Sequence, residues 1–320
     1  MRIIQSFWTR PARLGSNLAY NNRFCGGWLE SKYHFMSWAY SCLQLTKFYD
    51  HVEIITDTAG KELLIDQLKL PYTSVDTSLE ALDDLNPEFW AVGKLYSFSL
   101  QKRPFIHVDG DVYIWEKFPA RLENADLIAQ SREIGFSFYR KVLDEIIPAG
   151  ATVPDVVLNN YNNGLPINAY NAGIIGGKNL RFFEDYARLA IHFALSGEYF
   201  LGNVPAGMFN AVYEQHLCYC LAANKGIHVE CLSDELDKAV LNAQLKGLAN
   251  FRSAPGGTKY IHLFGEDAKK NPAVCEELAN KLRTDYPEYY KRAIEVADSS
   301  PEITGCHIDT EIDHPLIQKA

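Results

Sequence analysis

The segment PFIHVDGDVYIW, residues 104–115, decides the fold of this chain. Its apolar run at 105–108 is typical of a buried parallel strand, and it ends in two aspartates separated by a glycine. Open α/β sheets bind ligands at the carboxyl ends of their strands. Side chains alternate along a strand, so Asp109 and Asp111 should point the same way, and their mutual repulsion favours a divalent cation with oxygen ligands. Gly110 is expected to let the backbone approach whatever that cation carries.

The composition and net charge limit which kinds of partner the protein can bind. The 320 residues are 47% hydrophobic and carry a formal net charge of −9. A chain of this length can bury a sizeable core in one large domain or two small ones. The acidic balance argues against nucleic acid or an anionic membrane as a partner, because either would need a basic face. An acidic protein can still bind a diphosphate if a metal or a few lysines supply local positive charge.

Targeting and redox signals point to a cytoplasmic setting. Residues 1–8 start with strand-like residues and lack the basic stretch and apolar run of a signal peptide. No window reaches the roughly 18 apolar residues of a membrane span. The seven cysteines include no Cys-x-x-Cys, and Cys218 and Cys220 do not have the spacing of zinc ligands. We therefore expect a reduced, cytoplasmic protein with no integral membrane segment. The pattern does not predict an oligomeric state.

Strand and helix patterns alternate along the chain. This alternation predicts an α/β fold, with one mostly parallel sheet covered by helices on both faces, in a single domain over residues 1–298. The charged stretch 299–320 is expected to be poorly ordered, and the asparagine-rich stretch 159–164 is expected to be a loop. Strands are expected at 2–7, 52–56, 71–75, 105–108, 125–131, 169–176, 226–232 and 258–264, and helices at 31–49, 61–70, 89–101, 180–195, 211–223 and 271–296.

Two further segments carry residues suited to a binding site. In NAYNAGIIGG, residues 168–177, small residues flank a short apolar strand behind Asn171, which predicts the close approach of a ligand or of another backbone. Tight packing of the sheet against a helix would also explain these glycines. In YIHLFG, residues 260–265, His262 ends a strand. An imidazole beside two carboxylates suits a manganese-like cation, although a histidine at a strand end is more often a surface residue.

The three segments in this order resemble the GT-A glycosyltransferases, especially the retaining, glycogenin-like family 8 and its relatives. Those enzymes carry an Asp-x-Asp after a hydrophobic strand, an Asn-Ala-Gly strand followed by glycines, and a late His-x-x-Gly-x-x-Lys. The last motif here starts at His262, has Gly265 in register, and is one residue longer before its lysine. Lys269 and Lys270 are therefore both candidates for the lysine that binds phosphate. The resemblance spans residues 1–290 as scattered motifs.

The resemblance implies a GT-A, Rossmann-like fold and a metal-dependent hexosyltransferase. Such an enzyme moves a hexose from a nucleotide sugar, with a UDP-sugar the first expectation, to a saccharide or similar acceptor, with retention of configuration. Asp109, Asp111 and His262 would coordinate Mn²⁺ or Mg²⁺ between the two phosphates, where the metal acts as Lewis acid and template. Lys94 matches a basic residue that contacts the donor in related enzymes. A lysine on a helix surface is the alternative interpretation of Lys94.

Other residues take roles from the same resemblance. Phe7 and Trp8 end the first strand and Asp57 follows the second, where such folds hold the base and the ribose. A buried aromatic is the alternative for Trp8.

Glu214 and Gln215 resemble the Asp-Gln pair near the reacting sugar, and either could line its β-face. A polar first turn of a helix is the alternative for this pair. Asn171 would bind sugar hydroxyls, and the stretch 159–164 would belong to the acceptor site.

Three rival functions share some of these signals. A phosphatase of the haloacid dehalogenase type would use Asp109 as nucleophile, but its motif normally has threonine where Tyr113 stands. Such a phosphatase also has an acidic pair further along the chain, and Asp234 and Asp237 match that pair only loosely. A nucleotidyltransferase would need a glycine-rich phosphate loop after the first strand, and residues 9–15 are basic without those glycines. A non-catalytic nucleotide-sugar-binding protein would carry the same site without transfer.

Overall fold

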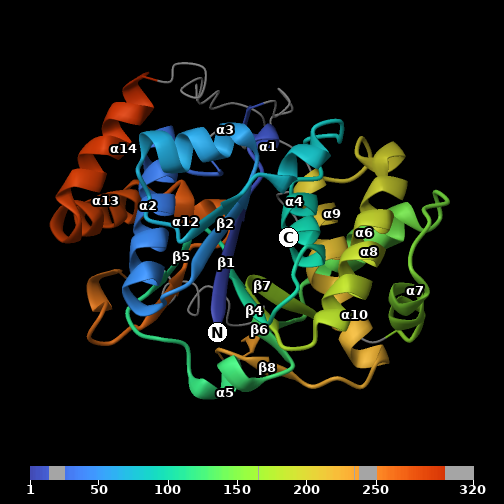
Figure 1. Cartoon of the computed structure of the whole chain (residues 1–320). Helices are drawn as coiled ribbons and strands as arrows, with labels where there is room; N and C mark the ends of the chain where they lie inside the picture. The colour runs from blue at the N-terminus through green and yellow to red at the C-terminus, as the bar shows by residue number, and fades with distance from the viewer. Residues whose placement is uncertain (14–25, 165, 234, 238–250, 300–320) are drawn as a thin grey trace.

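Apolar strands form one mixed sheet at the centre of the chain (Figure 1). The computed structural model describes residues 1–13, 26–164, 166–233, 235–237 and 251–299. The sheet has eight strands in the order β3-β2-β1-β4-β7-β6-β8, and β9 pairs with β6 off this path. The strands are β1 (Arg2–Phe7), β2 (Val52–Thr56), β3 (Ser74–Asp76), β4 (Phe105–Val108), β6 (Leu127–Ile134), β7 (Ala169–Gly177), β8 (Val229–Cys231) and β9 (Leu236–Asp237).

Most ladders of this sheet are parallel, which confirms the predicted fold class. β1 pairs in parallel with β2 and β4, β2 with β3, and β6 with β8 and β9. β7 is the exception, because it runs antiparallel to both β4 and β6. β4 was expected to be a purely parallel strand, and this is wrong on its β7 side. The consequence is that the middle of β7, and not its carboxyl end, lies beside the end of β4.

Helices cover both faces of the sheet, and each face has its own apolar core (Figure 1). Ile54 and Ile55 are neighbours in β2 and point into opposite cores, as the alternation of a strand requires. None of the described helices is both long enough and apolar enough to cross a bilayer. One core includes α2 (Ser31–Phe48), α13 (Pro272–Asp285) and α14 (Pro287–Ser299), and the other includes α4 (Ala91–Ser99), α8 (Leu180–Ser196) and α10 (Leu217–Asn224).

The shorter helices connect these elements. The α-helical ones are α1 (Arg10–Arg13), α3 (Thr58–Lys61), α5 (Ala120–Asn124), α6 (Ser137–Ile146), α7 (Asp155–Asn162), α9 (Ala206–Ala211) and α12 (Glu266–Lys269). Two segments are π-helical, η2 (Glu62–Gln67) and η5 (Val212–His216). Three are 3₁₀ turns, η3 (Ser78–Leu82), η4 (Glu198–Phe200) and η7 (Phe251–Ser253).

The structure corrects two predicted elements. Residues 159–164 were expected to be a loop, but most of them belong to α7. This helix buries Val157 on one side, and its asparagines can lie on the side that faces away from the core. The helix expected over 271–296 is two helices. Pro287 disfavours a helical conformation in the residue before it, and Tyr286 adopts φ −145° and ψ 66°. The tail from residue 300 lies outside the described residues.

A second, two-stranded sheet joins distant parts of the chain at the end of β4. β5 (Val112–Ile114) begins directly after Asp111 and pairs antiparallel with β10 (Tyr260–His262), with His262 opposite Val112. The Leu263 amide extends the ladder by donating to the Asp111 carbonyl oxygen at 3.0 Å. This register brings the late histidine to the aspartate pair.

Gly176 has no room for a side chain where β7 passes between β4 and β6. A Cβ at this position would lie 2.2 Å from the Phe105 carbonyl oxygen, which belongs to the backbone of β4 and cannot turn aside. We expect Gly176→Ala to lower the free energy of unfolding by about 2–3 kcal/mol, measured by urea denaturation. Gly202→Ala is the control, because its Cβ would meet open space, and it should change stability by less than about 0.5 kcal/mol. Equal stability of the two variants would contradict this account of the packing.

Candidate functional site

A cavity of about 450 Å³ lies at the carboxyl ends of β1 and β4. It collects residues from all three motifs and from both sides of the sheet. Asp57 and Lys270 are not among the described residues that line it. The residues proposed from sequence that do line it are Phe7, Trp8, Lys94, Asp109, Gly110, Asp111, Asn171, Glu214, Gln215, His262, Gly265 and Lys269.

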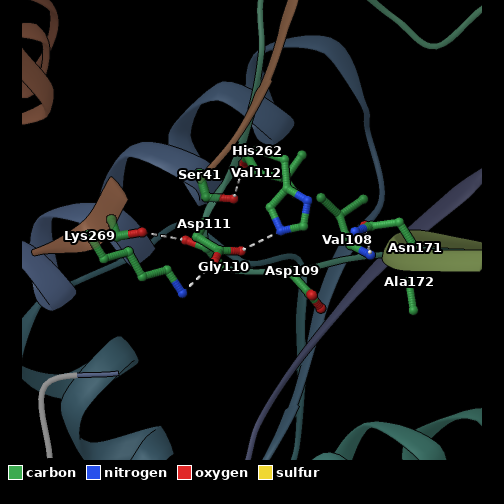
Figure 2. A network of polar contacts seen from close by, with 12 residues as sticks. Ser41, Val108, Asp109, Gly110, Asp111, Val112, Asn171, Ala172, His262 and Lys269 are labelled. Carbon is green, nitrogen blue, oxygen red and sulfur yellow. Dashed lines mark hydrogen bonds and ion pairs between the residues drawn. The ribbon is translucent and has the colours of Figure 1, made fainter. Parts of the chain in front are cut away.

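The two aspartates have different partners. Lys269 and His262 approach Asp111 from two sides, as Figure 2 shows, with the Lys269 Nζ at 2.6 Å and the His262 Nε2 at 3.4 Å from its carboxylate oxygens. Asp109 instead pairs with Lys94, whose Nζ lies 2.8 Å from Oδ1 and 2.9 Å from Oδ2. One ligand atom from each of Asp109, Asp111 and His262 lies within 4.8 Å of the others, so the three could hold a metal ion together.

The different partners separate the pKa values of the two aspartates. Burial raises the pKa of Asp109 to about 6 even though Lys94 opposes the shift. Burial acts in the same direction on Asp111, but Lys269 and His262 outweigh it and hold the pKa of Asp111 well below its usual range. The two carboxylates of one short turn therefore differ in their affinity for a proton.

Lys94 is the cation between the buried carboxylate of Glu214 and the half-buried carboxylate of Asp109. Its Nζ lies 2.8 Å from Glu214 Oε1 and 2.9 Å from the Ala172 carbonyl oxygen, besides its contact with Asp109. The three N–H groups of the ammonium are thus all used. Burial disfavours the charge, but Asp109 and Glu214 raise the pKa of Lys94 above its ordinary value. The Lys94 side chain is only 11% exposed, so its interpretation as a surface lysine is wrong.

The structure explains why glycine, and not a larger residue, stands at three positions of the motifs. A Cβ on Gly110 would lie 2.7 Å from the Trp38 ring, so this glycine makes room for an aromatic side chain, and its expected approach to a bound group stays a prediction. A Cβ on Gly173 would lie 2.3 Å from the His262 ring, so Gly173 makes the space that the imidazole occupies. Gly265 has φ 78°, in the left-handed region that favours glycine.

Asn171 is held by neighbours inside the cavity. Its Nδ2 donates to Glu133 Oε1 at 3.0 Å, and its Oδ1 accepts from the Gly173 amide at 3.1 Å. Glu133 is buried, it lines the cavity, and the sequence analysis missed it. A signal was present, because strand alternation places Glu133 on the same face of β6 as the apolar Leu127 and Ala129.

Glu214 and Gln215 lie in η5, in the middle of a helical run formed by α9, η5 and α10. Their interpretation as a first helical turn is therefore wrong. π-helical turns inside helices are frequent at functional sites, because the extra residue shifts the side chains that follow. Glu214 is 2% exposed at its side chain, and Gln215 Oε1 lies 2.8 Å from the Tyr139 hydroxyl oxygen. Both side chains line the cavity.

Aromatic side chains and a histidine form the cavity wall on the β1 side. The ring centroid of Phe7 lies 4.9 Å from that of Trp38 and 5.7 Å from that of His34. Burial lowers the pKa of His34 to about 3, so the ring is neutral near pH 7. Its Nε2 is buried without a hydrogen-bond partner in the described part of the chain. The sequence analysis missed Trp38 and His34, whose helical spacing is equally typical of a core.

Asp57 has a capping role and is not among the described residues that line the cavity, and its predicted contact with a ribose stays a prediction. Its Oδ2 accepts from the Thr9 amide at 2.8 Å and from the Thr9 hydroxyl at 2.7 Å, and its Oδ1 accepts from the Gly60 amide at 2.7 Å. The carboxylate is buried and ties the end of β1 to α3. Of the two candidate phosphate-binding lysines, Lys269 lines the cavity, whereas Lys270 is exposed.

The sequence as a whole matches one protein family. Residues 1–296 match the model of a family of unknown function, DUF6734. The chain belongs to this family. No curated protein matches this DUF6734 member by sequence.

Several solved structures are similar to this DUF6734 chain. The glycosyltransferase GlyE of Streptococcus pneumoniae TIGR4 has a TM-score of 0.43 at 12% identity, over 92% of this chain and 64% of that one. The bifunctional glycosyltransferase WbbM has a TM-score of 0.43 at 12% identity, over 91% and 51%. Mouse xyloside xylosyltransferase 1 has a TM-score of 0.38 at 11% identity, over 82% and 96%. The chain thus spans less than two thirds of the length of GlyE and about half of WbbM.

Removing Lys94 would leave the buried Glu214 and the half-buried Asp109 without their cation. We expect Lys94→Met to lower the free energy of unfolding at neutral pH by about 3 kcal/mol, measured by urea denaturation in EDTA. The deficit should shrink as the pH falls towards the wild-type Asp109 pKa of about 6, because without Lys94 this carboxyl binds its proton at a higher pH than in the wild type. Lys102→Met, at an exposed position, is the matched control and should be nearly neutral. A deficit that is independent of pH would contradict the role of Lys94.

Proposed function

We propose that the protein is a metal-dependent glycosyltransferase of the GT-A type. It would move a hexose from a nucleotide sugar to a saccharide or similar acceptor. The observation that carries the proposal is the convergence of Asp109, Asp111 and His262 on one cavity at the carboxyl ends of parallel strands. Lys269 adds a cation at the same place, 2.6 Å from Asp111. Such a cluster suits a diphosphate bound through a divalent ion.

Asp109, Asp111 and His262 are the residues that would hold the ion. Two carboxylates and an imidazole are hard oxygen donors with one nitrogen, a set that suits Mn²⁺ and also admits Mg²⁺. The fit is supported by the His262 Nδ1, which is buried without a hydrogen-bond partner in the described residues, so that this ring nitrogen is not used by the protein itself. When bound, the ion would supply Lewis-acid stabilisation to a departing diphosphate. Lys269 would add positive charge beside it.

The order of the strands suggests how the donor lies. β1, β4, β7 and β6 are successive neighbours, so the site extends about 15 Å across three strand spacings. The aromatic wall on the β1 side offers rings on which a base can stack, with Phe7, Trp8 and Trp38 among them. The diphosphate would lie at the end of β4. The transferred sugar would then lie towards β7, near Asn171 and the η5 turn.

We extend the proposal to retention of configuration, with Glu214 on the β-face of the sugar. Retaining transfer needs either a carboxylate nucleophile or a front-face reaction in which the leaving phosphate takes the proton of the acceptor. Glu214 is buried in the cavity wall and ion-paired with Lys94, which fixes the carboxylate in place for either route. The anomeric configuration of the product, read by NMR, decides between retention and inversion.

The rival interpretations find less support in the same geometry. A haloacid-dehalogenase-like phosphatase would need Ser131 beside Asp109, but Ser131 is not among the described residues that line the cavity. Asp234, one of its candidate acids, lies outside the described residues. A non-catalytic nucleotide-sugar-binding protein differs from the proposal only in turnover. Slow release of UDP from UDP-sugars in the presence of Mn²⁺ separates the two.

The donor site can be tested by calorimetry with UDP and Mn²⁺. We expect UDP to bind in the presence of Mn²⁺ and to raise the melting temperature, and we expect EDTA to abolish both effects. Asp111→Asn should weaken Mn²⁺-dependent UDP binding by at least about tenfold, because it removes a charged ligand. Asp84→Asn, at an exposed position, is the matched control. Undiminished binding by Asp111→Asn would rule out the proposed metal site.

Gly173 offers a test of His262 that leaves every candidate ligand in the chain. The Cβ of Gly173→Ala would displace the imidazole, since it would lie 2.3 Å from the ring. We expect about tenfold weaker Mn²⁺ affinity, measured by electron paramagnetic resonance titration, as is typical when the support of a ligand is lost. Gly202→Ala serves again as the control. An unchanged Mn²⁺ titration, with the ring shown by NMR to be displaced, would remove His262 from the metal site.

A further inference from the structure

Glu133 is a carboxylate inside the cavity to which the proposed donor site gives no role. It is only 6% exposed, and it lines the cavity from β6. In the described part of the chain no lysine or arginine forms an ion pair with it, in contrast to Asp109, Asp111 and Glu214. A buried carboxylate without a counterion is costly, so its presence in the wall of a binding cavity points to a ligand.

Two neighbours fix the orientation of Glu133. The Tyr139 hydroxyl donates to Oε2 at 2.6 Å, and the Asn171 Nδ2 donates to Oε1 at 3.0 Å. A carboxylate offers about four lone-pair sites, so these contacts leave about two sites for donors on a ligand. Tyr139 is itself held 2.8 Å from Gln215 Oε1, which connects Glu133 to the η5 turn.

Aromatic rings lie beside this carboxylate. Phe136 and Phe138 follow Glu133 along the chain, line the cavity and are half-buried. Their ring centroids lie 6.3 Å apart with the ring planes at 80°, and the Phe138 ring lies 4.0 Å from that of Tyr139. An exposed ring next to placed carboxylate and amide groups matches the two surfaces of a sugar, whose C–H face packs on a ring while its hydroxyls donate.

The sheet order separates this group from the base-binding wall. β6 lies two strands beyond β4, on the side away from β1, at about 10 Å from the strand that carries Asp109. That is the side on which an acceptor would meet the anomeric carbon of a donor sugar held near Asn171. The absence of a cation at Glu133 in the described chain also disfavours an acidic ligand, which its charge would repel.

We infer that Glu133, with Phe136 and Phe138, forms an acceptor subsite that binds the hydroxyls of a neutral saccharide. The inference rests on the proposed glycosyl transfer. Glu133 positions the acceptor by accepting hydrogen bonds from two of its hydroxyls, and the phenylalanines pack against its C–H face. Uronic acids and sugar phosphates are disfavoured, because the subsite offers them no cation among the described residues that contact Glu133.

Saturation-transfer difference NMR on the full chain with UDP and Mn²⁺ tests the subsite directly. The probes are the methyl β-glycosides of glucose, galactose and xylose, with methyl β-glucuronide as the anionic counterpart. We expect at least one neutral glycoside to bind and the glucuronide not to bind. Glu133→Gln should weaken that binding by at least about tenfold, since a carboxylate acceptor is lost. The amide can still accept from Asn171 and donate to the Tyr139 oxygen, so the variant should fold.

Phe138→Ala is the second variant, and it should weaken glycoside binding without changing UDP binding. Glu145→Gln is the matched control, because Glu145 is exposed on α6. Calorimetry with UDP and Mn²⁺ on the same samples keeps the two proposals apart. Intact UDP binding with no glycoside signal in the wild type, equal signals in Glu133→Gln, or equal binding of the glucuronide overturns the subsite and spares the donor site. Glycoside binding that depends on Glu133 in a protein that does not bind UDP supports the subsite and overturns the transferase.

Discussion

Buried negative charge in the cavity is tolerated because two lysines reach it from opposite faces of the sheet. Lys94 comes from α4, in one core, and Lys269 comes from α12, which packs beside the other core. Lys94 pairs with Asp109 and Glu214, and Lys269 pairs with Asp111, at contact distances of 2.6 to 2.8 Å. The packing of both helical layers therefore sets the electrostatics of the site, and a shift of either layer would expose an uncompensated charge.

The kind of side chain that lines the site changes from one strand of the sheet to the next. Its β1 side is aromatic and contains a neutral histidine, its centre holds the paired acids, and its β6 side offers Glu133 beside phenylalanine rings. Under the proposed function, the base, the diphosphate, the sugar and the acceptor would follow this order of surfaces across the sheet. The antiparallel β7 makes the order possible, because its middle residues, Asn171 to Gly173, lie beside the end of β4.

The sequence predicted the elements with strong local signals. The bounds of β1, β2 and β4 agree with those expected, because each contains adjacent β-branched or aromatic residues that favour a strand. Most of the site residues proposed from the motifs also line the cavity. Strand alternation could place Glu133 on one face of β6, but its contact with Asn171 depends on the pairing of β6 with β7, and the capping role of Asp57 depends on Thr9, far from it in sequence. The helix α7 was not predicted, because its asparagines are typical of loops and it buries only Val157.

The β5–β10 ladder has a consequence for how the protein matures. His262 reaches Asp111 only through this pairing of segments far apart in the chain. At ribosomal rates of about 5–20 residues per second, the nascent polypeptide carries the acidic turn for about 8–30 seconds before the histidine is synthesised. Contacts of such high sequence separation also cost more loop-closure entropy. The proposed metal-binding trio can therefore be completed only after the earlier strands of the sheet have been translated.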